Sequence, residues 1–197
     1  FNPHIIVKPY SQEISDLDLK KINILSDYIS RTSFTFNGQS ILINRDNTTG
    51  VLIRSYFNDD INKISLIKNG IIDGDLDLFN KNTVSIGKGL AINLNLVAGE
   101  EITLMSTSNI QSPFGSLPLQ EKFVISSIFS TGLAEFDQNV IFMPFENANS
   151  LFELTGMDIN LEIYLKKPID ADLIKNQIQD IYPAHHVFSW SDLNKSF

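Results

Sequence analysis

The two ends of the chain carry a β–α–β pattern that its middle lacks, and this contrast limits the fold more than any other feature. Near the start, the β-branched run His4–Lys8 predicts a strand. The helical spacing of apolar residues then predicts a helix over 15–29. Near the end, a strand, a helix and a second strand are predicted at 161–165, 170–181 and 186–189. Because two segments far apart in the sequence share this β–α–β pattern, they favour a single α+β domain that is split in sequence.

A hairpin is predicted inside the first of these segments. Phe34 and Phe36 alternate with Thr35 up to Asn37-Gly38, a dipeptide typical of a two-residue type I′ turn. Residues 41–43 are predicted as the second strand of the hairpin. A further strand at 51–56 and a short helix at 60–67 complete the segment.

The middle of the chain is mainly β in pattern. Short strands are predicted at 83–86, 101–106, 122–128 and 139–143, with short helices at 90–94 and 146–154. We therefore expect an α+β fold in which 1–70 and 156–197 form one α+β subdomain. Residues 71–155 form a mainly β subdomain inserted into it.

Composition excludes several classes of function. The chain is 43% hydrophobic and 19% charged, as expected of a folded globular protein. Its net charge of −8 repels phosphate backbones and argues against nucleic-acid binding. It has no apolar run of about 18 residues that would predict a membrane span. Without cysteine it has no disulfide, thiolate nucleophile or zinc–thiolate site, although this leaves the cellular compartment open.

Both ends of the sequence suggest a piece cut from a longer protein. The chain starts at Phe1 with neither an initiator methionine nor a signal sequence. It stops shortly after Ser191, a residue that could cap a helix that has barely begun. We expect both ends to be artificial cuts.

The histidines do not predict a catalytic or metal site. They are His4, His185 and His186, and neighbouring strand residues such as the last two point to opposite faces, which does not suit one metal ion. A Ser–His–Asp triad stays open on residue types alone, but the sequence has no G-x-S-x-G nucleophile elbow. We expect no catalytic residue, no metal and no cofactor.

Two further motifs have structural explanations. Gly87-Lys88-Gly89 lies between a predicted strand and a predicted helix, but Ile92 stands where a dinucleotide-binding turn needs a small residue. A tight turn explains it better. Asp73, Asp75 and Asp77 alternate as in a calcium loop whose glycine and glutamate are missing, so we expect a solvated acidic loop.

The segment 110–120 differs from an ordinary loop because its middle is apolar. Pro113 and Pro118 restrict its backbone and so reduce the entropy lost on docking. Phe114 beside Gly115 has the pattern of an aromatic residue presented at a turn. Either Phe114 folds back onto its own domain, or the segment is a protruding hairpin that inserts apolar side chains into a partner. We favour the second interpretation.

At this segment the sequence resembles a known family. The stretches that carry the resemblance are 113–118, 123–125, 135–137 and 142–148, with support from 2–7 and 189–193. They resemble the periplasmic domain of LolC/LolE-type permeases, which belong to lipoprotein-releasing ABC transporters in the MacB-like and FtsX-like superfamily. The resemblance extends over essentially the whole chain.

The resemblance implies a location and an architecture. Such a domain lies in the periplasm between the first two transmembrane helices of a permease in the bacterial inner membrane. It consists of a split porter-like α+β subdomain and an inserted, mainly β, sabre-like subdomain that carries a protruding hairpin.

The resemblance also implies a binding site for a LolA-like periplasmic chaperone. The loop that grips the chaperone, called the hook, corresponds to Ser112, Pro113, Phe114, Gly115, Ser116, Leu117 and Pro118. A second contact area, the pad, corresponds to Thr103, Gln120 and Glu121, with Lys122 beside them. Thr103 and Glu121 replace basic residues of the family pattern. Either the partner's charges differ too, or Lys122 takes over, or the permease is a type that pairs with itself.

The function implied is binding and relay of motion, not catalysis. A separate cytoplasmic ATPase subunit would hydrolyse ATP, and this domain would help to pass a lipoprotein from the membrane to the chaperone. The second permease subunit would be of LolC/LolE type or another copy. The alternatives are a MacB-like efflux domain, an FtsX-like activator of a cell-wall hydrolase and, from a different class, a periplasmic hydrolytic enzyme.

Overall fold

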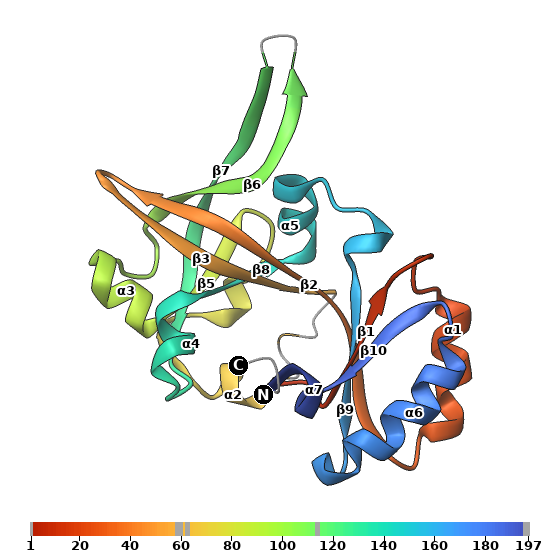
Figure 1. The fold of residues 1–197 in the computed structure, drawn as a ribbon. Helices are drawn as coiled ribbons and strands as arrows, with labels where there is room; N and C mark the ends of the chain where they lie inside the picture. The colour runs from red at the N-terminus through yellow and green to blue at the C-terminus, as the bar shows by residue number, and fades with distance from the viewer. Residues whose placement is uncertain (1, 58–60, 62–63, 113–114, 195–197) are drawn as a thin grey trace. The chain divides into compact units, whose positions relative to one another are not determined.

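The protein has a mixed α+β fold dominated by β-structure, as the sequence predicts (Figure 1). The computed structural model describes residues 2–57, 61, 64–112 and 115–194; within them it describes the backbone alone for 16–18, 65–66, 108–112, 115–117 and 193–194. The chain forms two compact units. Unit 1 comprises 1–35 and 154–197, and unit 2 comprises 36–153. The second division lies close to the expected one near 156. The first lies within a strand, 35 residues before the expected junction at 70.

Unit 1 is an antiparallel sheet with helices on one face (Figure 1). Its strand order is β10 (His185–Ser189), β1 (Ile5–Pro9), β9 (Asn160–Leu165) and the first part of β2 (Ile29–Asn44). The helices are α1 (Asp16–Lys21), the 3-10 helix η1 (Ile22–Leu25) and α6 (Ala171–Ile181). Two short 3-10 helices, η4 (Gly156–Asp158) and η5 (Pro168–Asp170), flank β9, and α7 (Trp190–Asn194) follows β10.

Alternation along the strands of unit 1 builds its core. Ile5 and Val7 of β1 turn to the helices and are fully buried, and Leu161 and Ile163 of β9 do the same. On α6 the residues with helical spacing, such as Ile174, are buried against them. The amphipathic helix predicted at 170–181 therefore forms as expected.

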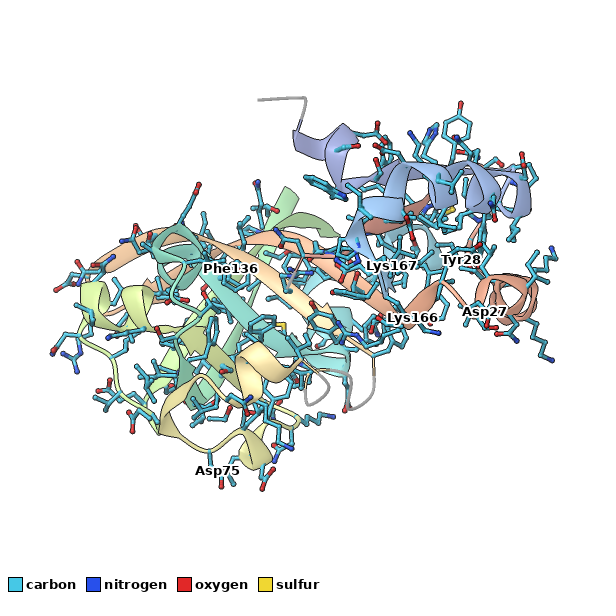
Figure 2. The ribbon with its side chains drawn as sticks, turned by 90° about the horizontal axis from the view of Figure 1, so that it is seen from below. Asp27, Tyr28, Asp75, Phe136, Lys166 and Lys167 are labelled. Carbon is cyan, nitrogen blue, oxygen red and sulfur yellow. The ribbon has the colours of Figure 1, made fainter. Side chains whose placement is uncertain are left out.

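The helix predicted at 15–29 is shorter than its apolar spacing suggests. It divides into α1 and η1, because the chain must turn into β2 at Ile29. Tyr28 is fixed at this turn by the backbone N–H of Lys166, which donates to its carbonyl oxygen at 2.9 Å. The two residues lie side by side in Figure 2. Pairing with the neighbouring segment thus overrides the local helical pattern.

The hairpin predicted at Asn37-Gly38 is wrong. Strand β2 runs through this dipeptide without turning, and the chain reverses at Arg45, whose φ is 54°, before β3 (Asn47–Tyr56). Glycine is required at position 38 for a different reason. A Cβ there would lie 2.5 Å from the Phe36 ring, which packs against Phe152 with ring centroids 4.9 Å apart.

The strands of unit 2 pair in a closed ring. The second part of β2 pairs with β3, followed by β8 (Val140–Pro144), β5 (Thr83–Gly87), β7 (Gly115–Phe129) and β6 (Glu101–Ser112), which pairs back with β2. The short strand β4 (Ile71–Gly74) adds to β7. The ring of pairings buries side chains such as Leu42, Ile53, Leu104, Phe123 and Phe142.

Short helices complete unit 2. They are α2 (Ser65–Lys68), η3 (Leu76–Leu78), α3 (Lys88–Leu94), α4 (Ala134–Asn139) and α5 (Phe145–Phe152). Phe136 of α4, labelled in Figure 2, packs with Phe129 and Phe142 at ring-centroid distances of 6.2 and 6.1 Å. Within the described residues, no helix is both long and apolar enough to cross a bilayer.

Candidate functional site

The segment predicted as a hook forms the end of the long β6–β7 hairpin. Ser112 pairs with Gly115, Gln111 with Ser116, Ile110 with Leu117, and Asn109 with Pro118. Pro113 and Phe114 lie outside the described residues. The prediction that Phe114 is exposed therefore stays a prediction.

The hairpin has two parts that differ in what they pair with. In the foot, 101–105 of β6 pair with 120–124 of β7, and 103–106 also pair with 40–43 of β2. In the end, 109–112 pair with 115–118, and these described residues form no ladder with another strand. Figure 1 shows the end extending away from the other strands of unit 2.

A β-bulge separates the foot from the end. Between the pairs Met105–Gln120 and Asn109–Pro118, β6 advances by two residues more than β7. Two hydrogen bonds between β6 and β2 fix the backbone at the bulge. Ser40 Oγ donates to the Met105 carbonyl oxygen at 2.8 Å, and Thr107 Oγ1 donates to the Gln39 carbonyl oxygen at 3.2 Å. Because a bulge bends its strand, it sets the direction in which the end leaves the ring of strands.

Three of the four predicted pad residues lie on one face of the foot. The pairing of β2, β6 and β7 forms one row of Ile43, Thr103 and Lys122, and a second row of Ile41, Met105 and Gln120. We call these six residues the foot surface. Gln120 and Lys122 are exposed and the other four are half-buried. The surface therefore has an apolar part on β2 and β6 and a polar part mainly on β7.

Glu121, the fourth pad residue, lies on the opposite face. Its row contains Leu42 and Leu104, both fully buried. Its carboxylate oxygen Oε1 accepts a hydrogen bond from the hydroxyl of Ser150 in α5. Glu121 thus ties a helix to β7, and its side chain points away from the foot surface.

The foot surface is weakly charged. Lys122 Nζ lies 2.7 Å from Glu101 Oε1 on the neighbouring strand, and both side chains are more than half exposed. Gln120 Nε2 donates to Met105 Sδ at 3.4 Å. The ammonium group of Lys122 is therefore largely neutralised by Glu101. What this surface offers a partner is mainly shape and apolar contact.

The sequence prediction missed Ile41, Ile43 and Met105. Alternation around Leu42 places both isoleucines on one face of their strand. Which residues of β6 stand beside them depends on the register between segments about 60 residues apart. No local pattern reports such a register.

The histidines lie in unit 1: His185 and His186 are in β10, and His4 directly precedes β1. His185 is buried and His186 is exposed, as the prediction of opposite faces requires. The His186 ring packs against Tyr10 at a centroid distance of 4.4 Å. Burial lowers the pKa of His4 from its ordinary value, and its Nδ1 accepts a hydrogen bond from the Leu165 backbone N–H at 2.8 Å.

The glycine motif forms a tight strand-to-helix turn as predicted, whereas the acidic segment is exposed but is not a loop, since Asp73 lies in β4 and Asp77 in η3. Gly87 ends β5 and caps α3, and a Cβ there would lie 2.2 Å from the Asp137 carbonyl oxygen, so glycine permits close packing of strand against helix. In the acidic segment, Asp73 accepts backbone N–H groups of Gly74 and Ala98, and Asp75 (Figure 2) accepts that of Asp77. No group of metal-ligating side chains occurs among the described residues.

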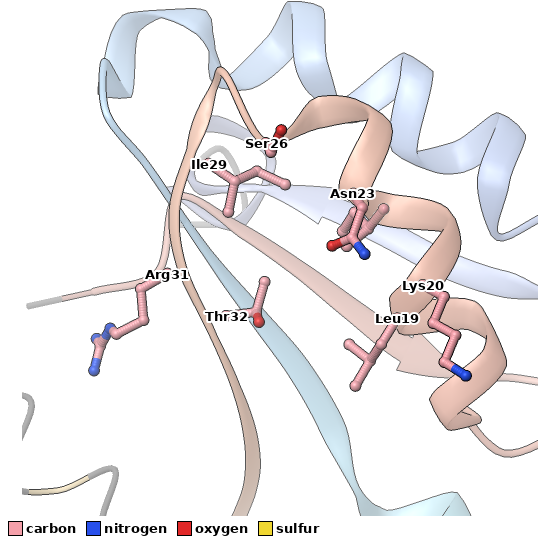
Figure 3. A pocket seen from close by; sticks show the side chains of 8 residues that line it. Leu19, Lys20, Asn23, Ser26, Ile29, Arg31 and Thr32 are labelled. Carbon is pink, nitrogen blue, oxygen red and sulfur yellow. The ribbon is translucent and has the colours of Figure 1, made fainter.

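An open groove of about 350 Å³ lies on unit 1 beside α1 and η1 (Figure 3). The residues that line it are Leu19, Lys20, Ile22, Asn23, Ser26, Ile29, Arg31 and Thr32. The Arg31 side chain points away from it in Figure 3, and its guanidinium lies 3.9 Å from the centre of the Tyr164 ring. Among the lining residues, Lys20 is therefore the one charged side chain that remains beside the groove. A single ammonium group does not make a set of converging reactive groups.

Comparison with known proteins gives weak but consistent sequence homology to one kind of permease. The chain is 25% identical over 132 residues to the lipoprotein-releasing system transmembrane protein LolC of Neisseria meningitidis, which covers 64% of this chain and 30% of the relative. It is 23% identical over 97 residues to LolC of Xylella fastidiosa, covering 48% and 24%. No protein-family model matches. The matches thus span about a quarter to a third of the length of these curated relatives.

Solved structures share the fold over nearly the whole chain. The extracellular domain of the noncanonic ABC-type transporter YknZ from Gram-positive bacteria superposes with a TM-score of 0.59 and 12% identity, covering 95% of this chain and 99% of that domain. The periplasmic region of MacB from Actinobacillus actinomycetemcomitans gives 0.55 and 10%, covering 98% and 91%. The fold is that of periplasmic domains of MacB-type permeases. The chain is thus similar in sequence to part of LolC and similar in fold to the YknZ and MacB domains.

Proposed function

We propose that this chain is the periplasmic domain of an inner-membrane permease that releases lipoproteins to a LolA-like periplasmic chaperone. A separate cytoplasmic ATPase subunit supplies the free energy. The second permease subunit is of LolC/LolE type or another copy of the same protein. The domain itself binds the chaperone and transmits motion, neither of which needs a catalytic group.

The observation that carries this proposal is the β6–β7 hairpin, together with the similarity to LolC. Residues 109–112 and 115–118 pair with each other beyond a foot that is fixed by β2. An arm of this kind can enter a concave partner while the ring of strands stays unchanged. A chaperone that shields acyl chains must have an apolar cavity, and an arm with an apolar turn suits such a cavity.

The hook residues Ser112 to Pro118 supply the grip. Proline at both 113 and 118 restricts the backbone before binding, so that less entropy is lost on docking. Phe114 supplies the largest apolar side chain of the segment. Burial of such a side chain in a partner contributes roughly 1.5–3 kcal/mol.

The pad corresponds to the foot surface. Of the predicted pad residues, the foot surface contains Thr103, Gln120 and Lys122 but not Glu121. It also contains three residues that were not predicted, namely Ile41, Ile43 and Met105. Apolar contacts on β2 and β6 replace the basic residues of the family pattern. The chaperone lies against this surface while the hook occupies its cavity.

Titration of this chain with its cognate chaperone tests the proposal. Phe114→Ala weakens binding about ten-fold or more, because one anchor side chain often carries more than 1.4 kcal/mol of the binding free energy. The free energy of unfolding changes by less than about 0.5 kcal/mol, since a loop tip contributes little core. The control Lys88→Ala, at the start of α3, changes neither quantity.

Two results would overturn the proposal. One is an absence of binding between the parent chain and the chaperone. The other is a Phe114→Ala variant that binds as tightly as the parent. A shortened hairpin, in which Gly-Asn replaces 112–118, guards against a misfolded variant, because it removes the hook while the foot keeps its pairing.

The fold similarity to MacB favours a second candidate, a domain of an efflux transporter. The chaperone titration separates the two candidates, since an efflux domain has no reason to bind a lipoprotein chaperone. An FtsX-like activator would instead bind a cell-wall hydrolase and fail the same titration.

A further inference from the structure

The three methionines are the only sulfur-containing residues of the chain, which has no cysteine. Met143 of β8 is 0% exposed, and Met157 of η4 is 42% exposed. Met105 of β6 is half-buried and belongs to the foot surface. Because an oxidant must reach the sulfur atom, the fold protects Met143 and leaves Met105 and Met157 open to oxidation.

Met105 has an amide donor beside its sulfur atom. Gln120 on the neighbouring strand donates from Nε2 to Met105 Sδ at 3.4 Å, and this contact is exposed to solvent. The two residues stand opposite each other in the β6–β7 ladder, and Ile41 of β2 completes their row. The Met105 backbone is fixed as well, because its carbonyl oxygen accepts the hydroxyl of Ser40 at 2.8 Å. The sulfur atom therefore has a defined place on the foot surface, next to a donor.

Oxidation of a thioether by hydrogen peroxide is a two-electron transfer of one oxygen atom. A lone pair of Sδ takes an oxygen atom from the peroxide, whose O–O bond breaks. The sulfur atom is oxidised to the sulfoxide, and the peroxide is reduced to water. No bond of the chain is broken, and methionine sulfoxide reductases return the thioether with two electrons from a thiol, releasing the oxygen as water.

A sulfoxide changes this part of the foot surface from apolar to polar. Its oxygen is a better hydrogen-bond acceptor than a thioether, which accepts only weakly, and the Gln120 amide is already placed to donate to it. The row of Ile41, Met105 and Gln120 then has a polar group at its centre. A partner that packs against the thioether would have to remove water from the sulfoxide, which costs free energy.

We propose that Met105 is a reversible oxidation site in the foot surface: its sulfoxide, held by the Gln120 amide, weakens binding of the chaperone, and reduction restores binding. The effect on the chaperone rests on the proposed function. The oxidation of Met105 and the hydrogen bond from Gln120 do not, since both follow from the chain alone.

The test treats the chain with hydrogen peroxide, removes the peroxide, and titrates the product with the cognate chaperone. Peptide mass spectrometry follows the oxygen gained by each methionine. Met105 and Met157 are oxidised at least about ten-fold faster than Met143, and equal rates for Met105 and Met143 would overturn the site. At a dose that leaves Met143 intact, chaperone affinity falls about five-fold. The two methionine sulfoxide reductases, one for each epimer of the sulfoxide, restore it with dithiothreitol as reductant.

Two substitutions assign the loss of affinity to one sulfur atom. Met105→Leu has no thioether on the foot surface, so its affinity, whatever its starting value, is the same before and after peroxide. Met157→Leu removes the more exposed sulfur atom and keeps the five-fold loss on oxidation. A loss in oxidised Met105→Leu, or no loss in oxidised Met157→Leu, overturns Met105 as the site that controls binding.

Urea unfolding of the oxidised chain tests the bond from Gln120 without any partner. Gln120→Leu has no amide to donate to the sulfoxide, so oxidation lowers its urea midpoint by roughly 0.3 M more than that of the parent. The control Gln138→Leu, on the exposed side of α4, shifts like the parent. Equal shifts in Gln120→Leu and the parent overturn the bond. If the unoxidised parent does not bind the chaperone, the proposed function fails, while the oxidation rates and the urea comparison still decide the Met105 site.

Discussion

The foot and the end of the β6–β7 hairpin use the same two strands under different constraints. In the foot, β6 pairs on both sides, with β2 and β7, and its inner residues Ile102 and Leu104 are buried. In the end, residues 109–112 and 115–118 have only each other as described strand partners. A two-stranded ribbon is marginally stable by itself, whereas several strands over an apolar core are firm. One hairpin thus joins a foot that packs on a core to an end whose described residues pair only with each other.

The bulge after Met105 is the boundary between these two behaviours. On one side of it, side chains alternate between the core and the foot surface, so packing specifies the inward-facing positions and the register. On the other side, residues 109–112 and 115–118 pair only with each other among the described strands. Substitutions on the core face of the foot should therefore change the free energy of unfolding, and those on the foot surface should change the affinity for the partner. Substitutions in the end of the hairpin should change the affinity.

The largest effect is expected for Leu104→Ala on the core face of the foot. Leu104 is 0% exposed, and loss of its buried methyl and methylene groups leaves a cavity between β2 and β7. We expect the free energy of unfolding to fall by about 2–5 kcal/mol in urea titrations.

Thr103→Ala is the matched control on the other face of the same strand. Because Thr103 is half-buried and faces away from the core, its free energy of unfolding should change by less than about 0.5 kcal/mol. Equal losses in the two variants would break the comparison, since both faces of the foot would then be packed alike.

A smaller effect is expected for Ile43→Ser on the foot surface. Ile43 is half-buried beside Thr103, and its truncation removes apolar area from the surface proposed to meet the chaperone. We expect chaperone affinity to fall about five-fold, as for an ordinary contact residue near an anchor, in the same titration.

Ile72→Ser is the control for that measurement. Ile72 is 54% exposed on β4, outside the foot surface, so its substitution should leave affinity unchanged. If Ile43→Ser binds like the parent while Phe114→Ala does not, the end of the hairpin carries recognition alone and the foot is only its support.

The elements of the molecule could be predicted from sequence where a local pattern agrees with the packing. The β-branched run at 4–8 and the helical spacing at 170–181 both give the observed elements within one or two residues. The turn predicted at Asn37-Gly38 is wrong because the turn signal is local. The Phe36 ring covers Gly38 and is held by Phe152, which belongs to a helix distant in sequence. A tertiary contact there defeats a strong local preference.

The composition of the foot surface shows the same limit at the candidate site. Resemblance placed Thr103, Gln120 and Glu121 together because they correspond to the family's pad positions, with Lys122 beside them in sequence. Adjacent residues on a strand point in opposite directions, which separates Glu121 from Lys122. Only the register among β2, β6 and β7 decides which side chains share a face, and that register is a property of the whole fold.

The smallest effect is expected for Lys122→Met, which tests whether the foot works by charge. Lys122 is 69% exposed and lies 2.7 Å from Glu101, so its charge is screened by water and offset by its neighbour. Such pairs contribute about 0–1 kcal/mol, and methionine keeps most of the apolar stem. We expect chaperone affinity within about two-fold of the parent and an equally shallow dependence on salt between about 0.05 and 0.5 M. The same measurement on Glu101→Gln leaves the Lys122 ammonium without its partner and should steepen the salt dependence if the chaperone is acidic there. A loss of about ten-fold in Lys122→Met, with a steep salt dependence in the parent, would mean that the foot recognises its partner by charge and that Lys122 has taken over from the family's basic residues.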